Sequence, residues 1–167
     1  MTNHFAVNDV CCVALELSKS TWVCAFASPE SGRASVHKMR ACDVDRLLRI
    51  LETGRARAMR EVSRSLEIVL CYEVGYDGFW LARLLMARGI RTIVFDPASF
   101  LKPRRGRLAK TDRLDAEEMT RILRSWLSGD HAIATAGAFP RSRRKMPSVS
   151  SVSARTLLRS GLVSSAG

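Results

Sequence analysis

The stretch Val10–Leu17 reads VCCVALEL and is apolar at every position except Glu16. A short, continuous apolar run of this kind is typical of a β-strand that is covered on both faces. The segment TWVCAFA, residues 21–27, follows after a short turn, and a weaker third strand is expected at about residues 34–38. Because the connections between these three runs are short, the sequence predicts an antiparallel meander.

The pattern then changes to helical spacing, which begins near residue 44 with apolar residues at Val44, Leu47, Leu48 and Leu51. Gly54 is expected to end or bend this helix, and residues 56–66 to resume it.

Two more apolar runs follow, and each of them predicts a strand. They cover residues 68–72 and 90–95, and an amphipathic helix is expected between them over residues 79–88. A last helix is expected from Asp112 to about residue 128, with Thr111 as its N-cap. The order of three strands, helix, strand, helix, strand and helix predicts a mixed α/β sheet, antiparallel first and parallel later.

The composition points to a reduced protein that is attracted to polyanions. The 167-residue chain carries a formal net charge of +11, which favours nucleic acid as a partner. Four of its five cysteines lie in apolar stretches, no two are spaced as C-x-x-C, and no apolar run is long enough to span a membrane. We therefore expect core thiols, no membrane segment and a cytoplasmic location.

Basic residues gather in two places. The segment FLKPRRGRLAKTDR, residues 100–113, could contact the phosphate backbone of a nucleic acid, or it could be a solvated loop. Its basic residues are Lys102, Arg104, Arg105, Arg107, Lys110 and Arg113. Residues 131–167 contain no Asp or Glu, and they read as a basic, Ser-rich and disordered tail after a domain formed by residues 1–130.

The last predicted helix carries two acids on its apolar side. Counting back from Met119 by four and by seven residues gives Asp115 and Asp112, which extend the apolar stripe. Acids in a first helical turn are stabilised by the helix dipole, so they could be ordinary helix-start residues. A bound cation would also explain why they lie on the apolar side.

Two further acids stand at the ends of predicted strands. Glu16 lies near the end of the first strand, and Glu73 directly follows the fourth. In an α/β sheet, functional groups gather at the carboxyl ends of strands. If the two strands are parallel neighbours, Glu16 and Glu73 come together with Asp112 and Asp115. Four carboxylates in one cleft require divalent cations, and the matching chemistry is two-metal phosphoryl transfer.

Four segments in this order resemble the DEDD transposases of bacterial insertion sequences, in insertion-sequence family one-hundred-ten. The segments are ALELSKSTW, CYEVGYDGFWL, VFDPASF and AKTDRLDAEEM, and the resemblance covers roughly residues 10–130. It implies a ribonuclease-H-like (RuvC-like) fold, a five-stranded mixed sheet flanked by helices. It also implies that Glu16, Glu73, Asp112 and Asp115 bind Mg²⁺ and act in DNA transposition.

The resemblance further implies partners, and the chain departs from the family pattern in two ways. The implied partners are DNA, a structured guide RNA and, in the full-length family, further copies of the chain. The first acid is usually Asp, whereas this chain has Glu16, whose side chain is one methylene longer. Family members continue into a separate C-terminal domain with a nucleophilic serine, so the tail suggests a truncated or frameshifted copy that is not competent for full recombination alone.

Two other functions remain open on the sequence. One is a stand-alone metal-dependent nuclease or junction resolvase that uses the same four acids. The other is a remnant that binds nucleic acid through its basic segments and has no catalytic activity.

Overall fold

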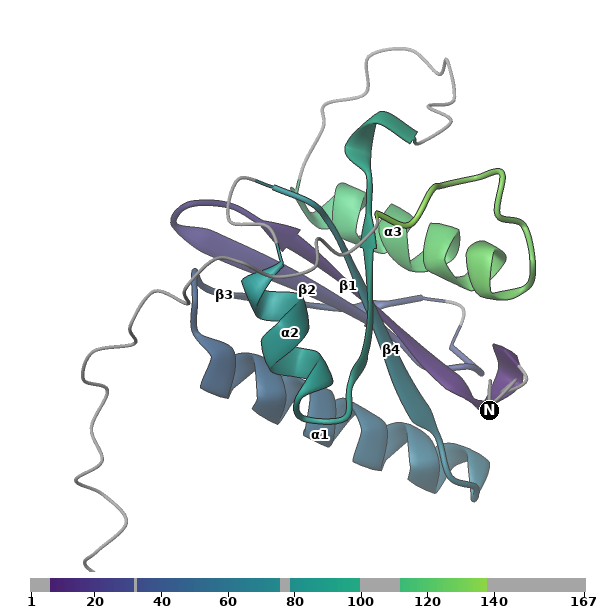
Figure 1. Ribbon diagram of the computed structural model, residues 1–167. Coiled ribbons are helices and arrows are strands. Elements are labelled where there is room, and N and C mark those ends of the chain that lie inside the picture. Colours follow the sequence, from purple (N-terminus) through teal and green to yellow (C-terminus); the bar gives the residue numbers. More distant parts are fainter. Residues whose placement is uncertain (1–6, 32, 76–78, 100–111, 138–167) are drawn as a thin grey trace, which may run out of the picture.

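The computed structural model describes residues 7–31, 33–75, 79–99 and 112–137 (Figure 1). For residues 112–114 it describes the helix but not the side chains. The expected contacts at Lys102, Arg104, Arg105, Arg107 and Lys110 therefore lie outside the described residues, as does the tail from residue 138 onward.

The centre of the fold is a five-stranded mixed sheet in the order β3-β2-β1-β4-β5. β1 pairs antiparallel with β2, and β2 pairs antiparallel with β3. β4 pairs parallel with β1, and β5 pairs parallel with β4. The strand bounds are β1 Val10–Leu17, β2 Thr21–Ala27, β3 Ser35–Arg40, β4 Glu67–Glu73 and β5 Arg91–Phe95. The predicted meander and the parallel second half are both confirmed, and the sheet is consistent with a ribonuclease-H-like fold.

Helices cover both faces of the sheet, so that the fold has three layers with the sheet in the middle (Figure 1). Helices α1 (Val44–Val62) and α2 (Trp80–Met86) pack on one face through Leu47, Leu51 and Leu85. Helix α3 (Asp112–Leu127) packs on the other face through Met119 and Leu123. Short 3-10 turns precede β1 at Val7–Asp9 and follow β5 at Pro97–Ser99.

The strand residues alternate between these two layers. Leu15 of β1 and Tyr72 of β4 belong to the core beneath α1 and α2, whereas Ala14 and Cys71 belong to the core beneath α3. This alternation is the period of two that strand geometry imposes. Burial on both faces explains why the strand sequences are nearly continuous apolar runs.

Gly54 does not end a helix, because α1 is one helix from Val44 to Val62. A Cβ atom on Gly54 would lie 2.8 Å from Cε2 of Phe26, a buried residue of β2. The glycine therefore lets the helix backbone approach an aromatic ring of the sheet, rather than interrupting the helix.

The prediction of core thiols is confirmed, because Cys11, Cys12, Cys24 and Cys71 are buried and free. Burial raises the pKa of the Cys11 thiol to about 11 and that of Cys24 to about 12. These four thiols are thus held protonated and unreactive at neutral pH. In the part of the chain that the structure describes, none of the helices has the length and apolar character needed to cross a bilayer.

Candidate metal centre at the carboxyl edge of the sheet

The register of β1 and β4 makes Glu16 and Glu73 neighbours. Leu15 of β1 stands opposite Tyr72 of β4 in the parallel ladder, and Glu16 and Glu73 are the next residue on each strand. Neighbouring strands are about 4.8 Å apart, so the two backbones come close at this edge. Both side chains are half-buried. The sequence-based expectation depended on β1 and β4 being parallel neighbours, and they are.

Both glutamates belong to the face of the sheet that α3 covers. Glu16 has the same parity along β1 as Cys12 and Ala14, which lie in the core beneath α3. Glu73 has the same parity along β4 as Val69 and Cys71, which lie in that same core. Since side chains alternate strictly along a strand, Glu16 and Glu73 share this face.

The electrostatics of Cys71 agree with that position for Glu73. The pKa of the Cys71 thiol is raised well above its usual value, first by burial and then by the charges of Cys12 and Glu73. The Cys71 thiol also donates a hydrogen bond to the backbone carbonyl of Met119 in α3, at 3.8 Å. The Glu73 carboxylate therefore acts on the layer between β4 and α3.

The remaining two candidate acids lie in the first turns of α3, the helix that covers this face. Ala116 is fully buried against Val23 and Ala25 of β2, and Met119 is buried one turn later. Asp115 directly precedes Ala116 and is half-buried. Asp112 is the first residue of α3, one turn earlier, and its side chain is outside the described residues.

The carboxyl edge thus carries Glu16 and Glu73 from two neighbouring strands, and carboxylate oxygens are ligands that Mg²⁺ prefers. Among the residues with described side chains, no three His, Cys, Asp or Glu groups are gathered closely enough to hold a metal ion. Asp112 is not among the residues with described side chains. Glu16 and Glu73 share one face and one edge of the sheet, and the metal site of four acids stays a prediction.

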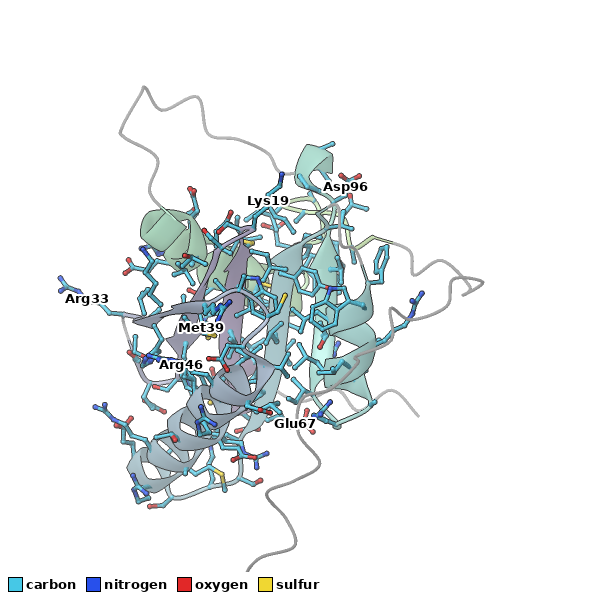
Figure 2. The ribbon with its side chains drawn as sticks, turned by 90° about the vertical axis from the view of Figure 1, so that its left-hand side faces the viewer. Lys19, Arg33, Met39, Arg46, Glu67 and Asp96 are labelled. Atoms are coloured by element: carbon cyan, nitrogen blue, oxygen red, sulfur yellow. The ribbon has the colours of Figure 1, made fainter. Side chains whose placement is uncertain are left out.

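Sequence reasoning did not single out Lys19, which lies at the same edge. Lys19 is exposed in the turn between β1 and β2. The Ser18 hydroxyl fixes this turn, accepting a hydrogen bond from the Thr21 N–H at 3.1 Å and donating one to the Thr21 carbonyl at 2.6 Å. Figure 2 shows Lys19 and Asp96 at one end of the molecule and Glu67, the first residue of β4, toward the other.

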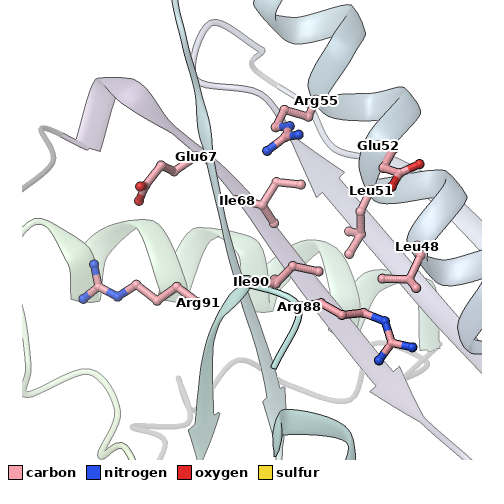
Figure 3. Close-up of a pocket in the computed structure, with 10 residues that line it drawn as sticks. Leu48, Leu51, Glu52, Arg55, Glu67, Ile68, Arg88, Ile90 and Arg91 are labelled. Carbon is pink, nitrogen blue, oxygen red and sulfur yellow. The ribbon is translucent and has the colours of Figure 1, made fainter. Parts of the chain in front are cut away.

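A pocket of about 450 Å³ lies far from these acids, beside the amino ends of β4 and β5. Its apolar residues Leu51, Ile68 and Ile90 lie between α1 and the sheet, and Arg55 and Arg88 flank them (Figure 3). Because functional groups of parallel sheets gather at the carboxyl edge, this pocket does not belong to the candidate metal centre.

Comparison with curated proteins gives matches named as transposases. The chain is 38% identical over 119 residues to "Putative transposase y4rJ" of Sinorhizobium fredii, which is 71% of this chain and 30% of that protein. It is 36% identical over 63 residues to "Transposase for insertion sequence element IS1533" of Leptospira borgpetersenii, which is 38% of this chain and 18% of that protein.

A third match, "Putative transposase y4qE" of Sinorhizobium fredii, is 37% identical over 76 residues, or 44% of this chain and 19% of that protein. The chain therefore spans 30% or less of the length of these relatives. No protein-family model matches the chain, and no solved structure matches it significantly. Over 71% of its length the chain is similar to part of the first of these proteins, and over 38% and 44% of its length to parts of the other two, all of which carry the name transposase.

Proposed function

We propose that this chain is a catalytic domain of the DEDD transposase type, which cleaves or transfers DNA strands by magnesium-dependent phosphoryl transfer. The main support is the register of β1 and β4, which sets Glu16 and Glu73 side by side on the face that α3 covers. The similarity to proteins named transposases supports DNA as the substrate. A basic chain of net charge +11 suits a polyanionic substrate.

Each acid has a role in this proposal. Glu16 and Glu73 would hold magnesium from the sheet, and Asp112 and Asp115 would hold it from the helix. The ions would supply a nucleophile at neutral pH and stabilise the leaving oxygen. Glu16 and Asp115 are half-buried, so their carboxylates lose part of their hydration and cation binding there is stronger than at a fully exposed surface.

Partners follow from the same proposal. Lys102, Arg104, Arg105, Arg107, Lys110 and Arg113 directly precede or begin α3, so they would contact phosphates beside the acids. A structured guide RNA and further copies of the chain are the other proposed partners.

The test is cleavage of supercoiled plasmid DNA by the full chain, with and without Mg²⁺. We expect Mg²⁺-dependent nicking that falls about 100-fold or more in Glu73→Gln, because losing a metal ligand costs several kcal/mol of transition-state stabilisation. Glu67→Gln is the matched control, since Glu67 begins the same strand at the opposite edge and should cleave like the wild type.

The outcomes separate the competing functions. Equal nicking by the wild type and Glu73→Gln would contradict the assignment of the acids, and an absence of Mg²⁺-dependent nicking would contradict catalysis. Salt-sensitive DNA binding without nicking would favour a nucleic-acid-binding remnant. Preferential cleavage of four-way junctions over linear duplex would favour a junction resolvase.

A further inference from the structure

Strand β3 carries two basic residues on the same face of the sheet as the proposed metal site. Val36 of β3 packs with Val23, Ala25 and Ala116 on the α3 side. Lys38 and Arg40 have the same parity along β3 as Val36, so they belong to this face. Met39, of opposite parity, is buried in the core on the α1 side.

The strand register places Lys38 in line with Glu16, two strands away. Lys38 stands opposite Val23 of β2, and Val23 stands opposite Glu16 of β1. Two strand spacings separate the backbones of Lys38 and Glu16, a distance of about 10 Å. Between them, Val23 is covered by Ala116 near the start of α3. Lys38 and Glu16 therefore flank the first turns of that helix.

Arg40 lies further toward the carboxyl edge, beside the turn that carries Lys19. Arg40 stands opposite Thr21, and the N–H of the next residue, Ala41, donates to the Ser20 carbonyl at 3.0 Å. The end of β3 is thus tied to the β1–β2 turn. Lys19, Lys38 and Arg40 together make one basic strip that borders the acids.

These cations are available to a ligand. Lys19, Lys38 and Arg40 are exposed, and none of the three forms an ion pair with a residue that the structure describes. Asp43, the acid nearest to Lys38 and Arg40 along the chain, accepts a hydrogen bond from the Arg46 N–H at 3.0 Å and caps α1. Uncompensated cations in a row bind a polyanion better than a single charge does.

We infer that Lys38 and Arg40 contact the phosphate backbone of the DNA strand on which the acids act, so that the strand leaves the site across β2 and β3. The inference rests on the proposed function, and it adds the path that the bound DNA strand takes over the sheet. The two residues are positioning residues, since the register sets them two strands away from Glu16. Carboxylates without a bound metal repel a DNA backbone, and cations beside them offset that repulsion.

The test is binding of a fluorescein-labelled 30-base-pair duplex by the full chain in EDTA, measured by anisotropy at several NaCl concentrations. The variant is Lys38→Gln/Arg40→Gln. The control is Arg49→Gln/Arg60→Gln, which removes two exposed charges from α1 on the opposite face. Circular dichroism and thermal melting of both variants report whether they fold like the wild type.

Loss of two phosphate contacts should make the slope of log Kobs against log[NaCl] shallower by about 1.8 and weaken binding roughly ten- to sixty-fold at 0.1 M salt. The control should change both quantities much less. Equal effects of the two double variants, or no effect of Lys38→Gln/Arg40→Gln, would overturn the inference and leave the Glu73→Gln cleavage result untouched. Failure of the wild type to bind DNA would overturn the proposed function as well.

Discussion

At the scale of single residues, Tyr72 shows how the sheet supports the helices that surround the site. Its hydroxyl is buried and accepts a hydrogen bond from the Ala82 N–H at 3.2 Å. Ala82 lies in the first turn of α2, where N–H groups have no partner within the helix, and Phe79 supplies no side-chain cap. Tyr72 thus caps α2 from a neighbouring strand, one residue before Glu73.

Replacing Tyr72 with Phe should lower the free energy of unfolding by about 1–2 kcal/mol, because it leaves the Ala82 N–H buried without an acceptor. Urea denaturation of Tyr72→Phe and the wild type at pH 7 measures this difference. A variant as stable as the wild type would show that the hydrogen bond contributes nothing to stability.

The same hydroxyl predicts a pH dependence. Burial raises the pKa of Tyr72 to about 12, against a usual value of 10. As the pH rises, the Tyr72 hydroxyl therefore loses its proton in the unfolded chain before it does so in the folded protein. The stabilisation that comes from keeping this hydroxyl protonated is fully present below pH 10 and is lost as the pH rises to 12. Urea denaturation between pH 9 and pH 12 should show a steeper loss of stability in the wild type than in Tyr72→Phe. Parallel curves would contradict the raised pKa.

At the scale of secondary structure, α1 is held on the sheet by a close approach at Gly54. The helix buries Leu47, Leu51 and Ala58 against the sheet. At Gly54 its backbone passes the ring of Phe26, so that an added Cβ would come within 2.8 Å of Cε2. Glycine is unfavourable in a helix by about 1 kcal/mol relative to alanine, and this contact explains its presence.

Gly54→Ala should therefore destabilise the protein by about 1–3 kcal/mol, although alanine is the better helix former. Thr53→Ala is the matched control, since Thr53 is exposed one residue earlier in α1 and the change should be neutral or slightly stabilising. Thermal melts of both variants decide the matter. A higher melting temperature for Gly54→Ala would show that the contact with Phe26 relaxes at no cost.

Elements whose signals are local could be predicted from the sequence. Continuous apolar runs and short connections identified the strands, and their order implied the mixed sheet. The role of Gly54 was misinterpreted, because the glycine makes room for the ring of Phe26 on β2, a residue far away in the sequence. Glu16 and Glu73 were singled out because each stands at or near the end of an apolar run, and the register of β1 and β4 makes them neighbours. The basic pair on β3 was missed, because its meaning depends on which face of the strand each residue occupies.

At the scale of the whole molecule, the sheet separates two kinds of surface. The carboxyl edge of β1 and β4 holds Glu16 and Glu73, and the basic strip of Lys19, Lys38 and Arg40 lies beside them on the turn after β1 and on β3. The amino edge holds the pocket between α1 and the sheet. Metal, substrate backbone and catalytic chemistry are therefore all proposed for one edge.

The central claim is that this edge binds divalent cations, and Mn²⁺ titration followed by electron paramagnetic resonance tests it most directly. Glu67 is the internal reference, since it lies six residue steps before Glu73 along β4, a distance of about 20 Å. We predict saturable binding by the wild type and by Glu67→Gln, with affinity at least tenfold lower in Glu73→Gln and in Asp112→Asn. Absence of saturable binding in the wild type, or equal affinity in all four proteins, would contradict the account.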